Sequence, residues 1–578
     1  MSLLMQQQQQ RWAAAAGATP RQRQHMPLTS RATPRPSPAP VAAAVASAVL
    51  PPPLRRARNP LGSHRRAPAR AAATTSATPA SLADAADELP SEVDVVIVGA
   101  GLAGLAAARA LLAGKNAAGG AAGAASASNA KPLSVLVLEA SDGVGGRART
   151  DVHPDGFLLD RGFHIFLTGY PECRDVLDYA GLDLKPFYAG ALVRIAGAWH
   201  RVADPFRHPI DGLLSLLPSN AVGSPLDKVN VGLFRLKCVL GGSLEALLAA
   251  EPERPTRERL AAEGFSEAMV GRFFRPFLGG IFFDRSLGVS DRLFAFVMRM
   301  LATGSNCLPA RGIGAMGEQM AAALPPRTVW VGARVEGVER EAGGGGRARV
   351  RVARGGGGAP GAPVAVVTAR RAVVVASEGP EARRLIAGAL ASSGGGEGGG
   401  SEAAALLPPS LGPPALGAPL GVGTACLYFD APLDAVPSGE PILYLNGGLT
   451  GPADAALVNN CCFPSTVAPS YAPAGRHLVS VSTIGTRPDL DDAALEAGAR
   501  RELGAWFGAD KVAAWRHLRT YRIPYAQPPQ APPTNLRRPV AVEGARGLFA
   551  CGDHLDTATF DGALLSGRRA AEAVMAMT

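Results

Sequence analysis

One segment near the start of this chain constrains its fold most: DVVIVGAGLAGLAAARALL, which begins at Asp94. Asp94 is followed by the continuous apolar run VVIV, so that residues 94–98 suit a strand buried on both faces, and residues 102–112 follow as a helical run. The turn between them has G-x-G-x-x-G spacing, which permits a tight turn, a close approach of pyrophosphate to backbone, and close helix–strand packing. The segment therefore predicts a dinucleotide site in an α/β (α+β) fold. We take its small residues as cofactor contacts: Gly99, Ala100, Gly101, Ala103 and Gly104.

A second apolar run, residues 134–138, is followed by Glu139 and Ala140. An acidic residue at the end of the next strand is expected to bind the ribose hydroxyls, about 20 residues after the glycines. Here the distance is longer, and the Gly/Ala/Ser-rich residues 113–130 account for the excess. Glu139 is therefore the candidate ribose ligand, with Ala140 beside it.

Two further stretches are predicted to complete the cofactor site. Gly145, Gly146 and Arg147 combine open backbone with a fixed positive charge, which suits a diphosphate. Near the C-terminus, a short strand at residues 548–551 leads into Gly552 and Asp553, and a helix begins near Gly562 and Ala563, its N-terminus directed at the ligand.

Between these stretches, a group of short strands is predicted at residues 328–331, 335–339, 347–352, 364–368 and 372–376. Val335, at the start of the second strand, is a further candidate cofactor contact.

These motifs, in their order along the chain, resemble those of the superfamily of FAD-dependent amine oxidases and carotenoid desaturases. Within it, LLDRGFHIFLTGYPECRDVL, residues 158–177, looks most like plant-type phytoene desaturases, with a G-x-H-I-F-x-x-x-Y-P core that includes Gly162 and His164. The resemblance implies a Rossmann-like FAD-binding domain of the glutathione-reductase type, built from discontinuous segments, with an inserted substrate-binding domain. It also implies that His164 faces the flavin, although a histidine among apolar residues also suits a core position.

On this basis we expect seven segments. They are a disordered transit peptide at 1–85, FAD-binding parts at 91–165, 309–390 and 541–578, substrate-domain parts at 166–308 and 419–540, and a low-complexity loop at 391–418.

Departures from the amine oxidases narrow the expected reaction. Those enzymes hold a water at the flavin with a lysine in P-L-G-x-x-x-K-C-x-x-Y, whereas this chain has PLGVGTACLYF, with Ala425 at that position and no lysine between Lys237 and Lys511. Thr559 takes the place of an aromatic residue that flanks the flavin, beside Phe560. The S-G-G-C-Y sequence that tethers flavin is also absent, so we expect noncovalent FAD.

Other residues support more than one interpretation. Arg275 is a candidate to anchor a quinone or carboxylate, or to pair with an acid between helices. Asp160 and Arg161 resemble a turn under the flavin, and a local ion pair explains them equally well. The apolar, aromatic residues 272–301 suit a helical core, a substrate tunnel or a face that dips into a membrane.

Charge and cysteine content exclude other classes of function. Residues 1–83 contain eleven arginines and no acid, so the remainder has 47 basic against 48 acidic residues. A nucleic-acid partner therefore lacks electrostatic support.

The arginine-rich tail is also rich in Ala, Ser, Thr and Pro, a composition that is typical of a transit peptide and favours plastid over mitochondrion. The chain has seven cysteines, an odd number, and none of them form a C-x-x-C pair. The sequence therefore gives no support for a zinc site or a disulfide framework.

The sequence thus predicts a plastid FAD-dependent oxidoreductase that removes hydride equivalents from an apolar carotenoid- or isoprenoid-like substrate. A quinone or oxygen would reoxidise the flavin, and the protein would associate with the membrane periphery. Two alternatives stay open: an amine or protoporphyrinogen oxidase that uses oxygen, and a non-catalytic flavoprotein.

Overall fold

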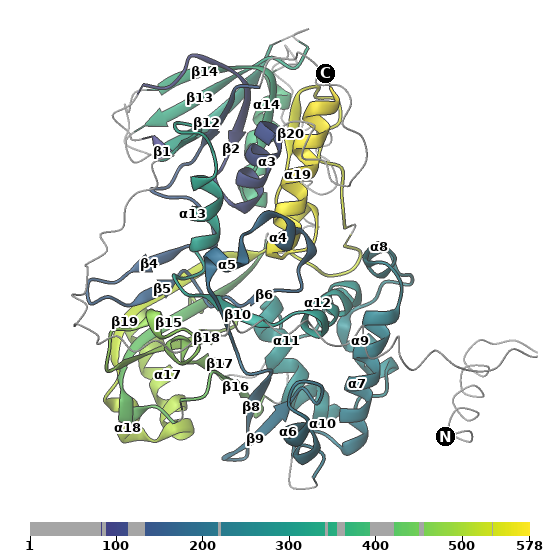
Figure 1. Cartoon of the computed structure of the whole chain (residues 1–578), viewed down its shortest axis with the longest axis vertical. Helices are drawn as coiled ribbons and strands as arrows, with labels where there is room; N and C mark the ends of the chain where they lie inside the picture. Colours follow the sequence, from purple (N-terminus) through teal and green to yellow (C-terminus); the bar gives the residue numbers. More distant parts are fainter. Residues whose placement is uncertain are drawn as a thin grey trace, which may run out of the picture. The chain divides into compact units, whose positions relative to one another are not determined.

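The computed structural model of the chain describes residues 82–83, 88–113, 133–217, 221–341, 345–354, 364–392, 421–437, 439–449, 456–534 and 536–577. The low-complexity loops and nearly all of the proposed transit peptide lie outside these residues. The described chain contains two large sheets (Figure 1). The first includes the strand that precedes the glycine-rich turn, and the second is formed by strands from residues 190–203 and 422–527.

The first sheet has a parallel core to which three distant stretches of chain contribute. Its strands are β1 (Leu82–Ala83), β11 (Val329–Trp330), β3 (Val135–Leu138), β2 (Glu92–Val98), β14 (Val364–Val375), β13 (Ala348–Arg354) and β12 (Ala333–Arg340), with β20 (Leu548–Ala550) also paired to β14. The strands β1, β11, β3, β2, β14 and β20 pair in parallel. The strand β13 pairs antiparallel with β14, and β12 pairs antiparallel with β13. The mixed α/β architecture and the Rossmann-like domain are confirmed.

Helices cover both faces of this sheet, which explains the continuous apolar run in β2. On one face, α3 (Leu102–Ala113) packs against α19 (Phe560–Ala576), and Val95 and Ile97 point into that layer. On the other, Val96 and Val98 point into the layer that contains α14 (Gly379–Ala391). A strand buried on both faces cannot alternate polar and apolar residues.

The structure corrects two expectations about this sheet. The strands predicted at 364–368 and 372–376 are one strand, β14, with only a register shift against β2 between Ala369 and Ala372. Arg370, which lies between the two predicted strands, pairs with Asp94 at 2.9 Å. In addition, β1 lies inside the stretch expected to be disordered up to residue 85, because its two residues pair with β11.

The second sheet has seven strands, in the order β19 (Arg516–Gln527), β15 (Val422–Pro432), β18 (Arg476–Thr483), β17 (Val458–Cys462), β16 (Leu443–Asn446), β8 (Gly190–Ile195) and β9 (Ala198–Ala203). A helix, α17 (Asp492–Phe507), packs on one face of it. Smaller sheets join β6 (Phe166–Leu167), β10 (Asn306–Pro309) and β7 (Leu184–Pro186), and β4 (Thr150–Val152) and β5 (Leu158–Asp160).

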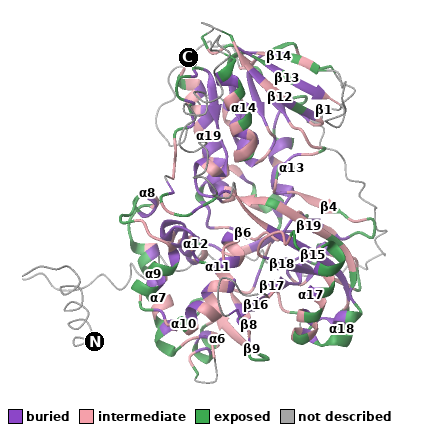
Figure 2. Cartoon of the chain, turned by 180° about the vertical axis from the view of Figure 1, so that it is seen from behind, coloured by how far each residue is buried: buried purple, intermediate pink, exposed green. Residues whose placement is uncertain are grey.

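A group of helices lies beside β8 and β9 (Figure 1). They are α6 (Pro209–Leu214), α7 (Pro225–Leu240), α8 (Leu244–Leu248), α9 (Thr256–Ala262), α10 (Glu267–Met269), a π-helical turn at Val270–Phe274, α11 (Arg275–Phe282) and α12 (Asp291–Thr303). Residues 272–301 therefore form the π turn, α11 and α12, and are mostly buried (Figure 2). Of the three interpretations of this stretch, the structure supports the helical core and the cavity lining, because its apolar side chains face the core or the cavity described below.

All seven cysteines are buried free thiols. Among the residues that the structure describes, no helix combines the length and apolarity needed to span a bilayer.

Candidate active site

A cavity of about 650 Å³ begins at the carboxyl ends of the parallel strands and extends toward α11 and α12. Val98, Leu138 and Ala376, which end or follow β2, β3 and β14, line its first part. Ligands of open α/β sheets bind at this edge, because the helix N-termini that follow the strands point there.

Two glycine turns meet backbone to backbone at the start of the cavity. The amide of Gly145 donates to the carbonyl of Ala100 at 2.8 Å, and Gly101 and Gly145 form a β-bridge. A Cβ on Gly104 would lie 2.0 Å from the carbonyl oxygen of Gly99, so close helix–strand packing requires glycine there. A Cβ on Gly101 would meet only the Cα of Gly146, at 4.0 Å, and otherwise point into open space. Gly101 is therefore free for a ligand's approach rather than required by packing.

The first turn of α3 gives this part of the cavity an anion-binding character. Gly101, Leu102 and Ala103 line the cavity at the N-terminus of the helix. The first amides of a helix have no intrahelical acceptor, and the helix dipole favours negative charge at that end.

Glu139 lies at the same end, directly after β3. Its carboxylate accepts hydrogen bonds from the amides of Ala100, at 2.7 Å, and Ser141, at 2.8 Å. These bonds hold the carboxylate at the cavity wall, where Glu139 and Ala140 are both lining residues.

Arg147 links the second glycine turn to the segment that precedes α19. Its guanidinium donates to both carboxylate oxygens of Asp553, at 2.7 and 2.9 Å, and to the carbonyl of Ala526 at 2.9 Å. It also lies 5.4 Å from the ring centre of Tyr525. Burial alone would lower the pKa of Arg147, but the Asp553 carboxylate outweighs burial and raises it. The guanidinium stays charged at the cavity wall, with part of its charge already balanced by Asp553.

The other proposed cofactor contacts divide between the wall and the packing behind it. Gly99, Gly146, Gly162, Val335, Gly552 and Ala563 also line the cavity. Ala100, Gly104 and Gly562 do not. A Cβ on Gly562 would lie 2.1 Å from the carbonyl oxygen of Thr557, so this glycine lets the chain turn tightly before α19. Short motifs contain both kinds of glycine, and only their three-dimensional surroundings separate them.

His164 lines the cavity. Its Nδ1 is 2.9 Å from the carbonyl oxygen of Gly162. Because a carbonyl can only accept, Nδ1 carries the hydrogen, and Nε2 is left with the lone pair. Burial lowers the pKa of His164 to about 4, so the ring is neutral at ordinary pH. The ring centre of Phe560 is 5.9 Å away.

Of three other candidate residues, Arg161 lines the cavity, as expected of a turn under the flavin, whereas Asp160 and Arg275 do not. Arg275 lies outside the described cavity wall and donates to the carbonyl of Arg285, so it does not contact a ligand there. Asp160 and Arg161 do not pair with each other. Arg161 pairs with Asp151 at 2.8 Å, whereas Asp160 accepts hydrogen bonds from Thr150, Ile313 and Tyr471. Burial raises the pKa of Asp160 to about 6.

The structure also corrects the position of Ala425. On β15, Ala425 points into the core beneath α17, and its neighbour Thr424 lines the cavity. Side chains alternate along a strand, so a one-residue error in alignment exchanges the two faces. Thr424 is itself fixed, because its hydroxyl donates to the carbonyl of Thr483 at 2.7 Å. The residue whose identity bears on the chemistry of the cavity is Thr424.

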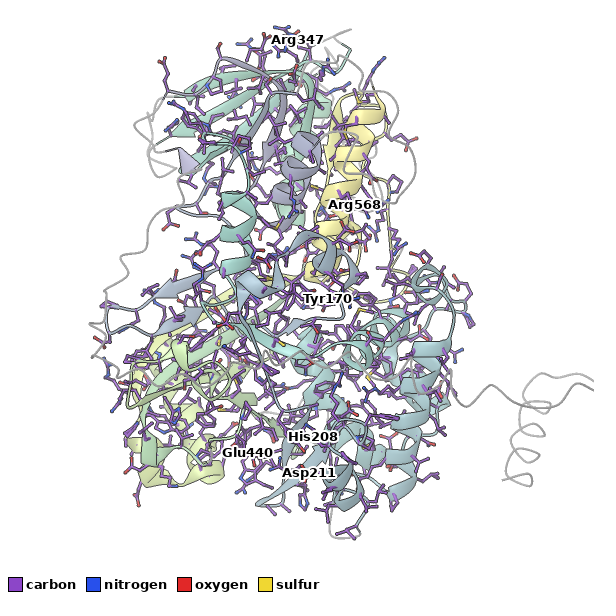
Figure 3. All side chains as sticks on the ribbon, in the orientation of Figure 1. Tyr170, His208, Asp211, Arg347, Glu440 and Arg568 are labelled. Atoms are coloured by element: carbon purple, nitrogen blue, oxygen red, sulfur yellow. The ribbon has the colours of Figure 1, made fainter. Side chains whose placement is uncertain are left out.

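The far part of the cavity is apolar. Its wall comes from α11, α12 and β16: Phe277, Ile281, Phe282, Val297, Leu301, Leu443 and Leu445. Tyr170, labelled in Figure 3, joins this wall immediately before α4 (Pro171–Val176) and stacks on Phe296, with ring centres 6.0 Å apart. None of the described lining residues of these three elements is acidic.

The start of α19 is fixed against α4 next to this wall. The Asp561 carboxylate accepts from the amides of Glu172 and Cys173, and Arg568, labelled in Figure 3, pairs with Glu172 at 2.7 Å. Burial raises the pKa of Asp561 to about 6. These contacts hold Phe560 and Ala563 at the cavity.

Sequence reasoning missed the residues that follow β14. Ser377, Glu378 and Glu381 line the cavity at the start of α14. Burial raises the pKa of Glu378. The signal was present, since ASEGPEA follows a buried strand and opens a helix, which is how ligand-binding loops of parallel sheets are placed.

A family model for flavin-containing amine oxidoreductases matches residues 102–575. The chain belongs to this family. Because members of this family contain flavin, the protein is an FAD-dependent oxidoreductase. The glycine turns, Glu139 and the Arg147–Asp553 pair at the cavity fit a dinucleotide.

Solved structures share the fold of this flavin-containing amine oxidoreductase at low sequence identity. A putative protoporphyrinogen oxidase from Exiguobacterium sp. 255-15 has a TM-score of 0.57 at 16% identity, covering 84% of this chain and 99% of that one. Cyclohexylamine oxidase from Brevibacterium oxydans has a TM-score of 0.54 at 17% identity, with the same coverage. Putrescine oxidase bound to putrescine has a TM-score of 0.53 at 16% identity, also with that coverage.

Proposed function

We propose that this protein is a plastid oxidoreductase that removes hydride equivalents from an apolar, isoprenoid- or carotenoid-like substrate, with noncovalent FAD and a quinone or oxygen as electron acceptor. The observation that carries the proposal is the far part of the cavity, walled by aliphatic and aromatic side chains of α11, α12 and β16. Burying apolar surface is the favourable contribution that such a wall offers a ligand. The G-x-H-I-F-x-x-x-Y-P core supports the same substrate class.

Bound FAD would supply the hydride acceptor, which the protein's own side chains lack. The chain binds and orients the dinucleotide through the first turn of α3, the second glycine turn, Glu139 and the Arg147–Asp553 pair. The apolar wall excludes water from the reacting carbon.

Losing a hydride leaves a carbon chain that must also lose a proton to form a double bond. The Nε2 of His164 is the proton acceptor that this site offers, because Nδ1 is engaged with Gly162 and the ring is neutral. The low pKa makes His164 a weak base, suited to a strongly acidic cationic intermediate of the substrate.

An ammonium-bearing substrate suits this cavity less well. A buried ammonium needs a carboxylate or a set of acceptors, and the described parts of α11, α12 and β16 at the wall contribute no acid. The acids that do line the cavity, Glu139, Glu378, Glu381 and Asp553, lie with the glycine turns or the start of α14.

Anaerobic stopped-flow measurements test the proposal. Flavin absorbance should bleach when the holoenzyme is mixed with a carotene in detergent, and persist with spermine or protoporphyrinogen. The photoreduced enzyme should then be reoxidised faster by a short-chain plastoquinone analogue than by oxygen. Bleaching by spermine or protoporphyrinogen, with peroxide formed in air, would establish the oxidase alternative. Absence of bleaching with all three substrates would favour the non-catalytic alternative.

The plastid assignment rests on the eleven arginines and the absence of acids in residues 1–83. A fluorescent fusion of the full chain should enter plastids, and a fusion lacking residues 1–81, which keeps β1, should stay in the cytosol. Plastid import of the shortened fusion would overturn the assignment.

A further inference from the structure

The helices α6 and α7 present an apolar surface that the described chain leaves uncovered. On α7, the exposed side chains are Leu226, Val229, Leu233, Leu236 and Leu240, with exposed fractions from 38% to 66%. They recur every three or four residues, so they form one stripe along the helix. The opposite face of α7 holds the buried Phe234 and Cys238. The helix is therefore apolar on its outer side as well as toward the core.

A second helix extends the stripe into a face. Ile210, Leu213 and Leu214 of α6 are 74%, 68% and 53% exposed. In Figure 2, α6 and α7 lie in the same group of helices. Scattered exposed leucines need no explanation, but a contiguous patch on two helices marks a contact surface.

The acidic residues of both helices are turned away from this face. Asp211 of α6 accepts a hydrogen bond from the Tyr188 hydroxyl, and the Tyr188 ring stacks on His208, with ring centres 4.0 Å apart. Asp211 and His208 are labelled in Figure 3. Asp227 of α7 is buried, where it accepts from Ser224 and Ser266 at the helix start. Two lysines lie on α7: Lys237 is exposed and pairs with Glu263 at 2.7 Å, whereas Lys228 donates to the carbonyl of Ser215 at the end of α6. The face is thus aliphatic, with the cation Lys228 where α6 and α7 meet.

The same face adjoins the wall of the cavity. Arg207, just before α6, donates to the carbonyl of Leu301, whose side chain lines the cavity. Arg235 of α7 donates to the carbonyl of Ala302 at 3.2 Å. The end of α12 is therefore shared between the cavity and the base of the apolar face.

We propose that α6 and α7 dock this protein on a lipid bilayer with anionic headgroups. Aliphatic side chains that insert at the boundary of headgroups and acyl chains, together with flanking cations, are the features of helices that lie in a membrane surface. Docking places the end of α12 next to the bilayer, so an apolar substrate has a short path from lipid to cavity. The inference that a substrate enters from the lipid rests on the proposed function, whereas the inference that the protein docks on a bilayer does not.

Vesicle flotation tests the proposal with the FAD-loaded full chain. The probes are phosphatidylcholine vesicles with and without phosphatidylglycerol. Wild-type protein should float with both after a high-salt wash, and more strongly with phosphatidylglycerol. The variant L213D/L233D should bind roughly a hundredfold more weakly, because each substitution removes an inserted leucine. Its flavin absorbance and melting temperature should be unchanged, since both side chains are exposed.

The matched control is V152D/L433D, which places two aspartates at exposed apolar positions on β4 and after β15 (66% and 56% exposed). It should bind vesicles as the wild type does. All variants keep the arginine-rich tail, so a difference between them reports on the helices. Equal binding of L213D/L233D and wild type would overturn the proposal. So would a wild-type dimer in sedimentation that L213D/L233D converts to a monomer without a change in flotation, because the face would then be an interface between two copies.

Discussion

The guanidinium of Arg147 and the carboxylate of Asp553 form a two-pronged ion pair, although 406 positions separate them in the sequence. The pair ties the second glycine turn, after β3, to the loop between β20 and α19. Asp553 is nearly buried, with 9% of its side chain exposed. The ends of the cofactor site are thereby fixed to each other before any ligand binds.

Removing one partner should therefore weaken both the fold and flavin retention. In Asp553→Asn, Arg147 loses its countercharge in a partly buried position, and we expect the free energy of unfolding to fall by about 1–3 kcal/mol. Denaturant titration measures this, and the ratio of flavin to protein absorbance measures retention. The control is Asp489→Asn, which breaks the exposed 2.7 Å pair with Arg487 and should cost less than about 0.5 kcal/mol. Equal losses in both variants would contradict a special role for the Arg147–Asp553 pair.

Gly101 allows loss of cofactor to be separated from loss of fold. A Cβ there meets no protein atom closer than 4.0 Å, so Gly101→Val should fold but block the approach of pyrophosphate. The purified variant should lack flavin while its apoprotein unfolds at about the temperature of wild-type apoprotein. Gly104→Ala is the contrasting variant, because its Cβ would overlap the carbonyl of Gly99, and it should express poorly or unfold early. Full flavin content in Gly101→Val would show that the pyrophosphate lies elsewhere.

His164 should give the reaction and the fold a dependence on acid pH. Only the neutral ring accepts a proton, so substrate-driven flavin reduction should be constant near neutral pH and fall as the pH drops through about 4. The folded-state pKa lies below the ordinary value of 6.5, so the stability it contributes is fully present above 6.5 and is lost as the pH falls toward 4. In His164→Gln, flavin should be retained, reduction should slow by roughly 10²-fold, and this part of the pH dependence should disappear. An unchanged rate and pH profile in His164→Gln would remove His164 from the reaction.

Thr424 and Ala425 provide a test of which face of β15 meets the cavity. Ala425→Lys places a charge in the core beneath α17 and should lower the free energy of unfolding by about 3 kcal/mol or more. Thr424→Lys directs the same side chain into the cavity, so the protein should keep its fold and react with oxygen faster when reduced. Stopped-flow oxidation of both proteins, with circular dichroism as the check on folding, distinguishes them. A stable Ala425→Lys protein would contradict the strand's orientation.

Local patterns in the sequence determined the cofactor half of this protein. The apolar run of β2, the glycine spacing and Glu139 after β3 are short-range features, because a strand, a tight turn and a helix start depend on neighbouring residues. The strand Val364–Val375 was predicted as two strands, and within it Arg370 pairs with Asp94, 276 positions away in the sequence. Local composition shows that a charge is present but cannot show which distant acid balances it.

Only the tertiary structure decided the features that depend on residues far apart in the chain. One such feature is the Arg147–Asp553 pair. Others are the position of Thr424 rather than Ala425 at the cavity, the position of Arg275 outside the cavity wall, and the exposed face of α6 and α7. An apolar residue has the same character in the sequence whether it is covered by another element or left open to solvent. The physical reason is that burial and charge balance are properties of packed neighbours, and those neighbours are chosen by the fold rather than by adjacent residues.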